Sequence, residues 1–407
     1  MTRRHDLDAL RVAAFALLIL YHVGMVYVPE WRFHLKSPVE LAWIEWPMVL
    51  VNRWRMSLLF LLSGITLGLV LARAPSLRLA ALRSWRLLLP LAVGIVAVVP
   101  VQAYYEARTL GTIEPGYGTF LLRYLQLRPW PPGSFTGAEY GFTWNHLWYL
   151  AYLWTYTMVV LAARPLLRAG GGPRLATWLT GHGRWLLWTL PPLAFLAALL
   201  VLAPRYPSTH ALAGDWFNHA RYFGAFAVGV LVARSTPAWA ALRAYRWRLA
   251  VLAFAGATLY MGLRVIGRLV DGGRLPPEPF LALMPEAGWD LLSSAGQALY
   301  WWTALLALLG WGARALDRPW PGLARASIAV YPWYILHQSL IIAAAYWLIP
   351  FALGPVLEPL LVLALTVAGC ALGYALIQRV GWLRPLFGLP AQRHGPGVAL
   401  PTARAPA

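Results

Sequence analysis

Apolar runs of about 20 residues, separated by short polar breaks, recur along this chain. A helix needs a run of about that length to cross the hydrocarbon layer of a membrane, which is about 30 Å thick. Ten such runs are found, at 12–28, 48–72, 87–104, 145–163, 185–203, 216–233, 248–265, 291–311, 325–348 and 356–378. The sequence therefore predicts an all-α polytopic membrane protein with about ten transmembrane helices.

Composition agrees with a chain that lies mostly in lipid. Of its 407 residues, 60% are hydrophobic and 12% are charged, whereas a soluble domain is usually about 45–50% apolar and about 25% charged. The single cysteine, Cys370, excludes a disulfide framework, a thiolate zinc site and an iron–sulfur cluster. No HExxH motif, Gly-rich phosphate loop or carboxylate cluster is present. We therefore expect no metal and no permanently bound cofactor.

The positive charge of the chain predicts its orientation. Lys and Arg number 34 against 15 Asp and Glu, a net charge of +19. In a soluble protein this excess suggests nucleic acid, but here it lies in the short breaks between apolar runs, so we expect no nucleic-acid partner. With the N-terminus inside, the inner segments carry 22 of the basic residues and three acids, and the outer side carries twelve of each. The positive-inside rule then places both termini in the cytoplasm.

The segments outside the runs predict one domain. The outer stretch 105–144 is rich in glycine and proline, and we expect an irregular cap there. The tail 381–407 is rich in proline and poor in apolar residues, so we expect it to be cytoplasmic and disordered. Acidic residues before the first run, and no small-residue cleavage site after it, favour a permanent helix over a signal peptide. Residues 1–380 are thus predicted to form one transmembrane domain, with no separate soluble domain.

Ionisable residues within apolar runs are costly, which makes them candidates for function. Arg11 and His22 are eleven residues apart, close to three helical turns, so they share one helix face about 16 Å apart. This spacing places Arg11 at the cytoplasmic mouth and His22 near the middle of the membrane. Asp8 can pair with Arg11 at i,i+3. The alternatives are that Arg11 is only an orientation signal and that His22 is a packing histidine.

A second histidine, His337, is predicted at a similar depth. It lies twelve residues beyond Arg325 in a run that crosses in the same direction as the first. Further polar side chains flank the two histidines: Tyr21, Tyr331, Tyr334 and Gln338. These residues predict a polar cavity within the bundle. A buried core histidine is the alternative for His337, and Pro332 in the same run leaves its direction open.

The second run contains further candidates. Arg55, close behind Arg53, is expected about two turns below the outer face. It either snorkels to the interface or binds an anion within the bundle. Ser63 is a candidate for substrate binding, but with Gly64 it also fits small-residue helix packing and is a poor candidate nucleophile.

The outer start of the fourth run also carries candidates. An aromatic belt at the membrane surface explains its Trp and Tyr residues. It does not explain Asn145 and His146, which we expect to face the cavity from outside. Asp215, His219 and Arg221, at the outer start of the sixth run, form a weaker cluster.

Taken together, these motifs resemble acyltransferase family 3. They are Asp8-x-x-Arg11, the Arg-x10-His spacing that ends at His22, Arg55-Met56 before Phe60-x-x-Ser63-Gly64, His146-Leu147-Trp148-Tyr149-Leu150, and Ala326-Ser327-Ile328-x-x-Tyr331 with His337. The likeness covers nearly the whole chain and is greatest to the branch that contains the periplasmic glucan succinyltransferase. Some members carry an appended hydrolase-like domain, which we do not expect here, and the likeness implies a place in a bacterial inner membrane.

The resemblance implies an O-acyltransferase that moves an acetyl or succinyl group from cytoplasmic acyl-CoA, its co-substrate, to a hydroxyl of an extracytoplasmic glycan or another envelope acceptor. His22 is the expected general base, with Arg11 and His337 as its catalytic partners. The expected substrate-binding residues are Asp8, Arg55, Asn145, His146 and Ser63. Direct transfer and an acyl-histidine intermediate both stay open. With succinyl-CoA as donor, Arg53 or Arg55 is expected to pair with its free carboxylate.

The alternative function is a secondary transporter, or an exporter of an envelope polysaccharide precursor. Such a protein also needs ionisable residues in the middle of the membrane. Transporters of this kind typically contain repeats and paired broken helices, which the sequence does not show. The deep groups are His and Arg rather than acids, which favours anionic donors over cation coupling.

Overall fold

The computed structural model describes residues 3–71, 75–169, 174, 177–178, 181 and 184–391. No strand occurs among these residues. The longer helices are α1 (His5–Tyr27), α2 (Glu45–Leu71), α3 (Ser76–Ala97), α4 (Val99–Thr109), α6 (Trp148–Ala169), α8 (Arg184–Val201), α9 (Trp216–Val232), α10 (Thr236–Asp271), α12 (Glu286–Ala315), α13 (Leu323–Leu348) and α14 (Gly354–Arg379). Short elements are η1 (Ala42–Ile44), α5 (Tyr117–Tyr124), η2 (Ala138–Tyr140), η3 (Asn145–Leu147), α11 (Glu278–Leu283), η4 (Ile349–Phe351) and α15 (Leu383–Leu386).

Each predicted apolar run falls on a helix, and the third run is shared by α3 and α4. Six helical segments of the described chain are long and apolar enough to cross a membrane: His5–Tyr27, Ala42–Leu71, Ser76–Thr109, Thr236–Asp271, Leu323–Phe351 and Gly354–Arg379. A shorter apolar segment, Trp185–Val201, lies in α8. The chain is therefore an all-α polytopic membrane protein. The count of ten spanning helices stays a prediction, because α6, α8, α9 and α12 fall outside this set of six.

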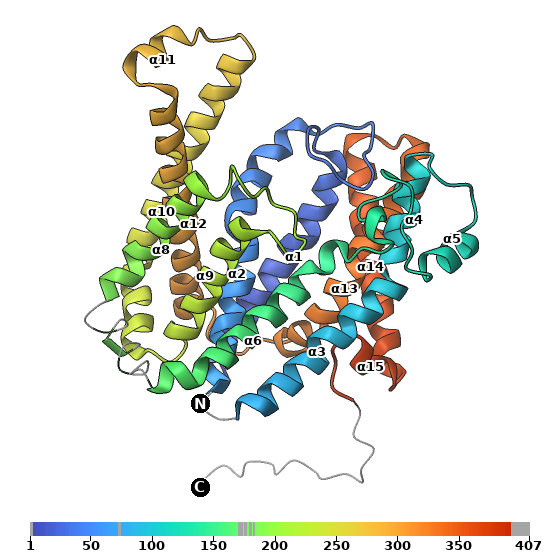
Figure 1. Cartoon of the computed structure of the whole chain (residues 1–407), viewed down its shortest axis with the longest axis horizontal. Coiled ribbons are helices and arrows are strands. Elements are labelled where there is room, and N and C mark those ends of the chain that lie inside the picture. Colours follow the sequence, from blue (N-terminus) through green and yellow to red (C-terminus); the bar gives the residue numbers. More distant parts are fainter. Residues whose placement is uncertain are drawn as a thin grey trace.

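Successive long helices run up and down through the bundle (Figure 1). The start of α1 and the short helix α15 lie at the same end of the molecule, as an even number of crossings requires. At the opposite end, α10, α11 and α12 form a hairpin that protrudes beyond the other helices. Helices α10 and α12 extend beyond their predicted runs, 248–265 and 291–311, at both ends. Arg268 lies in the added part of α10 and Arg264 near the end of the predicted run, and both pair with Glu45 at the start of α2.

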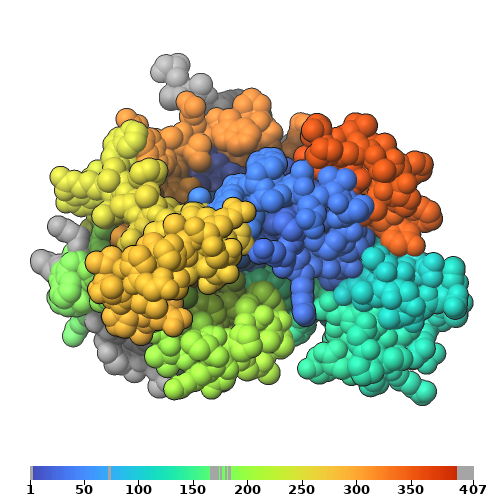
Figure 2. All heavy atoms as spheres, turned by 90° about the horizontal axis from the view of Figure 1, so that it is seen from above, coloured from blue at the N-terminus to red at the C-terminus, as the bar shows by residue number. Residues whose placement is uncertain are grey.

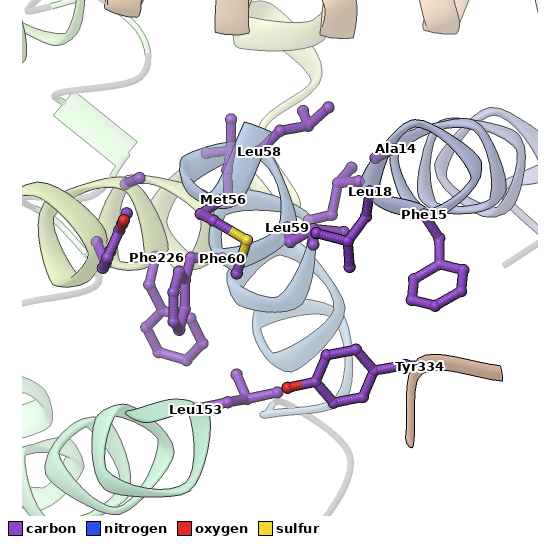
Figure 3. Packing of buried hydrophobic residues seen from close by; sticks show 14 of the residues in the cluster. Ala14, Phe15, Leu18, Met56, Leu58, Leu59, Phe60, Leu153, Phe226 and Tyr334 are labelled. Carbon is purple, nitrogen blue, oxygen red and sulfur yellow. The ribbon is translucent and has the colours of Figure 1, made fainter. Parts of the chain in front are cut away.

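The core lies around α1 and α2, which Figure 2 shows in blue between the yellow–orange hairpin and the red C-terminal helices. Phe15 and Leu18 of α1 face Leu59 of α2 and Tyr334 of α13 (Figure 3). Helices α2 and α9 approach even more closely, because glycines line their contact. A Cβ atom added at Gly64 would lie 2.0 Å from a backbone oxygen of α9. This contact confirms the prediction of small-residue packing at Gly64.

The outer stretch 105–144 is folded rather than wholly irregular. It contains α5 and η2 and has its own apolar cluster, in which Phe120, Trp130 and Phe135 pack together. The Tyr124 hydroxyl donates to the carbonyl oxygen of Thr143 at 3.3 Å, and burial raises the pKa of Tyr124 to about 12. Aromatic side chains, which the glycine and proline content does not reveal, hold this cap together.

The first part of the tail that we predict to be disordered is ordered in the structure. Residues 383–386 form α15, and Leu389 is buried just beyond it. The side chain of Arg384 donates to the carbonyl oxygen of Pro390 at 2.9 Å, which closes the turn. Disorder is therefore the wrong prediction for this part, because its few apolar residues find a surface on the bundle. The remainder, 392–407, lies outside the described residues.

Candidate active site

Helices α1 and α13 bring His22 and His337 into direct contact. The Nδ1 atom of His22 lies 2.9 Å from the Nε2 atom of His337, and the two rings are stacked with their centroids 5.1 Å apart. Pro332 lies within α13 but does not interrupt it, so His337 is aimed into the bundle. This contact brings the two predicted histidines together, and the polar cavity around them stays a prediction.

Hydrogen-bond partners assign the proton on each ring. The Nδ1 atom of His337 lies 2.7 Å from the carbonyl oxygen of Tyr334. Because a carbonyl oxygen only accepts, Nδ1 of a neutral His337 carries the proton and its Nε2 is an acceptor. The Nδ1–H of His22 then donates to His337, which leaves a lone pair on Nε2 of His22. No hydrogen bond to this Nε2 atom is formed within the described part of the chain.

His146 is placed by the short helix η3. Asn145 has a φ of 40°, a left-handed conformation that Asn adopts more readily than most residues. This turn points the His146 side chain inward just before α6 begins, and only 6% of its surface is exposed. Its Nε2–H donates to the carbonyl oxygens of Tyr334 and Ile335, both at 3.1 Å. His146 therefore contacts the same turn of α13 that holds His337.

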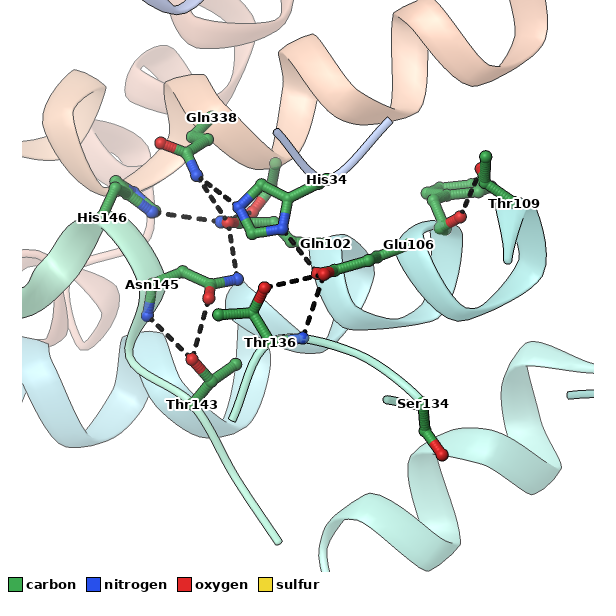
Figure 4. Close-up of polar contacts among 12 residues, drawn as sticks. His34, Gln102, Glu106, Thr109, Ser134, Thr136, Thr143, Asn145, His146 and Gln338 are labelled. Carbon is green, nitrogen blue, oxygen red and sulfur yellow. Dashed lines mark hydrogen bonds and ion pairs between the residues drawn. The ribbon is translucent and has the colours of Figure 1, made fainter. Parts of the chain in front are cut away.

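Gln102 of α4 joins His146 to a wider polar network (Figure 4). Its amide nitrogen lies 3.1 Å from Nδ1 of His146 and 2.8 Å from Oγ of Ser339. Its amide oxygen accepts from Asn145 at 3.0 Å and from Gln338 at 3.1 Å. A break between α3 and α4 at Val98 precedes Pro100 and starts the helix that carries Gln102.

The outer part of this network contains a carboxylate. The Nδ1 atom of His34 lies 2.6 Å from Oε2 of Glu106, and its Nε2 atom lies 3.0 Å from the amide nitrogen of Gln338. Thr136 of the outer cap donates to Oε1 of Glu106 from both its amide and its hydroxyl. Polar contacts thus run from the cap to the histidines without a gap.

Arg11 lies at the other end of α1, apart from the histidines. Its Nη1 atom is 3.6 Å from Oδ1 of Asp8, which confirms the predicted i,i+3 pair. Its Nη2 atom donates to the hydroxyl of Thr66 on α2 at 3.0 Å. Asp8 also accepts from Ser327 of α13 at 3.0 Å. This cluster ties the inner ends of three helices together around a partly exposed guanidinium.

The candidates on α2 have different surroundings. Arg55 is buried, with its guanidinium carbon 3.5 Å from the centre of the Tyr21 ring, so it does not snorkel to the outer interface. Ser63 Oγ lies 2.8 Å from the hydroxyl of Tyr149. Ser63 therefore contacts a tyrosine and not a base.

The weaker cluster at the start of α9 splits into separate contacts. Asp215 accepts from the Tyr152 hydroxyl. His219 lies 2.9 Å from the hydroxyl of Tyr156. Arg221 donates to the carbonyl oxygen of Asn52 at 2.9 Å. These contacts tie α9 to α6 and α2.

Sequence reasoning did not single out His34, Thr66, Gln102 or Glu106. A signal was present for Gln102, a polar residue inside the third apolar run, and for Glu106, an acid at its end. His34 lies in a connection between helices and Thr66 is only weakly polar, so neither stands out. No three His, Cys, Asp or Glu side chains converge as metal ligands would among the residues described.

One of three comparisons with known proteins identifies the family of this chain. A family model for acyltransferases of type 3, described as an acyltransferase domain, matches residues 4–376. Comparison with curated proteins and with solved structures found no match. The matched range contains every residue of the histidine cluster and of the Arg11 cluster. This chain belongs to acyltransferase family 3 and is a membrane acyltransferase.

Proposed function

We propose that this acyltransferase moves an acyl group from cytoplasmic acyl-CoA to a hydroxyl of an extracytoplasmic glycan or another envelope acceptor. The observation that best supports the proposal is the lone pair on Nε2 of His22, inside the bundle. Acyl transfer to an alcohol needs a base that removes the hydroxyl proton as the oxygen attacks. A positioned histidine typically contributes about 10²–10⁴-fold to such a step.

In the proposed reaction, Nε2 of His22 takes the proton of the acceptor hydroxyl. The hydroxyl oxygen forms a bond to the thioester carbonyl carbon, and the carbon–sulfur bond then breaks. The proton on His22 passes to the leaving thiolate, so the products are the ester and free CoA. His337 holds the His22 ring through Nδ1 and accepts a stronger hydrogen bond when His22 becomes positively charged.

Arg11 is proposed to hold the donor at the inner end of the bundle. Its guanidinium is partly exposed and shared between Asp8 and Thr66, so it can turn toward an anionic phosphate. The excess of basic residues on the predicted inner side favours the same placement for CoA. The proposal keeps both termini in the cytoplasm of a bacterial cell and the chain in its inner membrane.

Turnover of acyl-CoA by the purified protein tests the proposal. Wild-type protein in detergent, given acetyl-CoA or succinyl-CoA and a glycan acceptor, is expected to release free CoA and form an ester. His22→Ala is expected to lose at least 99% of this activity, whereas His5→Ala, far from the histidine pair on the same helix, is expected to keep it. A His22→Ala protein that retains more than about a tenth of wild-type activity contradicts the base role.

Proteoliposomes of one orientation test the sidedness. Acyl-CoA supplied to the side of the inner loops is expected to support ester formation on the opposite side, without passage of free CoA. A requirement for both substrates on one side contradicts transfer through the membrane. Net movement of a substrate without ester formation supports the transporter alternative instead.

A further inference from the structure

Three arginines inside the bundle form no ion pair with any carboxylate in the described chain: Arg53, Arg55 and Arg221. Arg55 and Arg221 expose only 5% and 7% of their surface. The Nε atom of all three, and Nη1 of Arg55, are buried without a hydrogen-bond acceptor there. Because an isolated buried charge is costly, these unpaired donors favour an anion-binding role for the three arginines.

The neighbours of these arginines orient them without neutralising them. Arg221 donates through Nη2 to the carbonyl oxygens of Asn52 and Arg53, one turn or less before Arg55 on α2. Arg55 lies over the ring of Tyr21, and the guanidinium carbon of Arg221 lies 5.3 Å from the centre of the Tyr222 ring. Carbonyl oxygens and aromatic faces carry only partial negative charge. The cluster keeps its net positive charge.

The carboxylate nearest in sequence to Arg221 accepts hydrogen bonds from other groups. Asp215, the residue before α9, is fully buried. It accepts hydrogen bonds from the Tyr152 hydroxyl and from the side-chain amide of Asn218. The backbone amides of Thr209 and His210 donate to it as well. Asp215 therefore holds the connection before α9 and is not the counterion of the arginines.

The arginine cluster lies next to the proposed base. Arg55 packs on Tyr21 at 3.5 Å, and the ring centroids of Tyr21 and His22 are 6.0 Å apart. Tyr21 thus separates the guanidinium of Arg55 from the imidazole of His22 by a single ring. A substrate whose reacting group is at His22 can place a charged end among the arginines.

We infer that Arg55 and Arg221, together with Arg53, form a binding site for a carboxylate carried by one of the two substrates. A guanidinium is planar and presents paired N–H groups that match the two oxygens of a carboxylate. The carboxylate belongs either to the acyl group, as in a half-ester of a dicarboxylic acid, or to an acidic sugar of the acceptor. The inference rests on the proposed function only for naming these two carriers.

Thermal unfolding of the purified full chain with small probes tests the site without turnover. Monomethyl succinate against dimethyl succinate represents the acyl group, and methyl glucuronoside against methyl glucoside represents the acceptor. At saturating concentration and constant ionic strength, one acid is expected to raise Tm by about 2 °C or more above its neutral partner. That acid identifies the carrier. Equal Tm values within both pairs overturn the inference.

Two variants test whether the Tm difference between acid and neutral probes depends on the arginine cluster. Arg55→Met removes a buried charge but keeps the length of the side chain, so the empty protein is expected to be as stable as wild type or more stable. It is expected to lose the Tm difference between acid and neutral probe, whereas Arg128→Gln, an exposed arginine of the outer cap, keeps it. An Arg55→Met protein that responds as wild type does overturns the inference.

A charge-conserving variant covers the case in which Arg55→Met does not fold. Arg55→Lys keeps the charge and loses the paired donors, so the acid concentration that gives half the Tm shift is expected to rise at least tenfold. An unchanged concentration overturns the inference. Turnover of acyl-CoA by wild-type protein is measured separately, so intact turnover without a carboxylate response rejects this site and leaves the proposed function standing.

Discussion

The Nδ1 atom of His22 lies 2.9 Å from the Nε2 atom of His337, although the two residues are 315 positions apart. The Tyr334 carbonyl oxygen fixes the proton of His337 at a distance of 2.7 Å, and His337 in turn fixes that of His22. In the proposed reaction, the neutral imidazole of His337 has the orienting role that a carboxylate has in hydrolase triads. The proposed base is then held without a negative charge from His337.

Substitution of His337 distinguishes orientation from simple packing. His337→Leu leaves the Nδ1–H of His22 without an acceptor, and we expect kcat to fall about 100-fold or more, with KM for acyl-CoA little changed. His337→Gln places an amide oxygen within reach of the same proton, so it should keep at least ten times the activity of the Leu variant. Steady-state kinetics measure both, and equal losses in the two variants contradict the orienting role.

Arg11→Lys tests the cluster at the inner end of α1. A guanidinium contacts Asp8 and Thr66 from two nitrogens at once and can bind a phosphate in the same way, whereas an ammonium is a single point charge. We expect KM for acyl-CoA to rise at least tenfold, about 1.4 kcal/mol, with normal insertion. Arg78→Lys, an exposed arginine of α3, is the control. Full activity of Arg11→Lys would reduce Arg11 to an orientation signal.

The sequence identifies the two histidines that meet inside the bundle, but not the polar residues around them. His22 and His337 stand out because each is an ionisable residue in an apolar run, and the spacing of Arg11 from His22 follows from helix geometry. Gln102 and His34 do not stand out in this way. They join the polar network only because particular helices and connections pack together, and a single sequence does not show which ones do.

For the fold, the apolar runs locate the helices but not all of their ends. The predicted run 248–265 ends where polar residues become frequent, yet α10 continues to Asp271, and Arg268 in this extension pairs with Glu45 of another helix. The break at Val98 in the third run follows from Pro100, which lacks the N–H that continues a helix. Such ends are set by tertiary contacts and by proline rather than by hydropathy.

The contact of α2 with α9 predicts opposite effects for two glycines of one helix. A Cβ at Gly229 would lie 2.3 Å from the carbonyl oxygen of Leu61, whereas a Cβ at Gly224 meets nothing within 4 Å. We expect Gly229→Ala to lower Tm by several degrees, or to prevent folding, because the backbones must separate. Gly224→Ala is the matched control and should leave Tm equal or higher. Similar Tm values for both variants contradict the close packing.

The connection between α8 and α9 places a histidine against the outer end of α6. The ring of His210 stacks on Trp148 with centroids 4.1 Å apart, and its carbonyl oxygen accepts from the indole of Trp144 at 3.1 Å. His210 has a φ of 55°. Burial lowers the pKa of His210 to about 4; Asp215 opposes this change, while Arg221 reinforces it.

This low pKa of His210 makes stability depend on pH. Between about pH 4 and pH 6.5, the unfolded chain binds a proton at His210 and the folded chain does not, so acid favours unfolding and stability falls as pH falls through this window. His210→Asn keeps a residue that tolerates positive φ but cannot titrate. We expect it to be less stable than wild type at pH 7, because the stack on Trp148 is lost, and the difference in Tm to shrink as pH falls from 6.5 to 4. His5→Asn, at the start of α1, is the matched histidine control. A His210→Asn difference in Tm that stays constant over this range contradicts a neutral His210 in the folded protein.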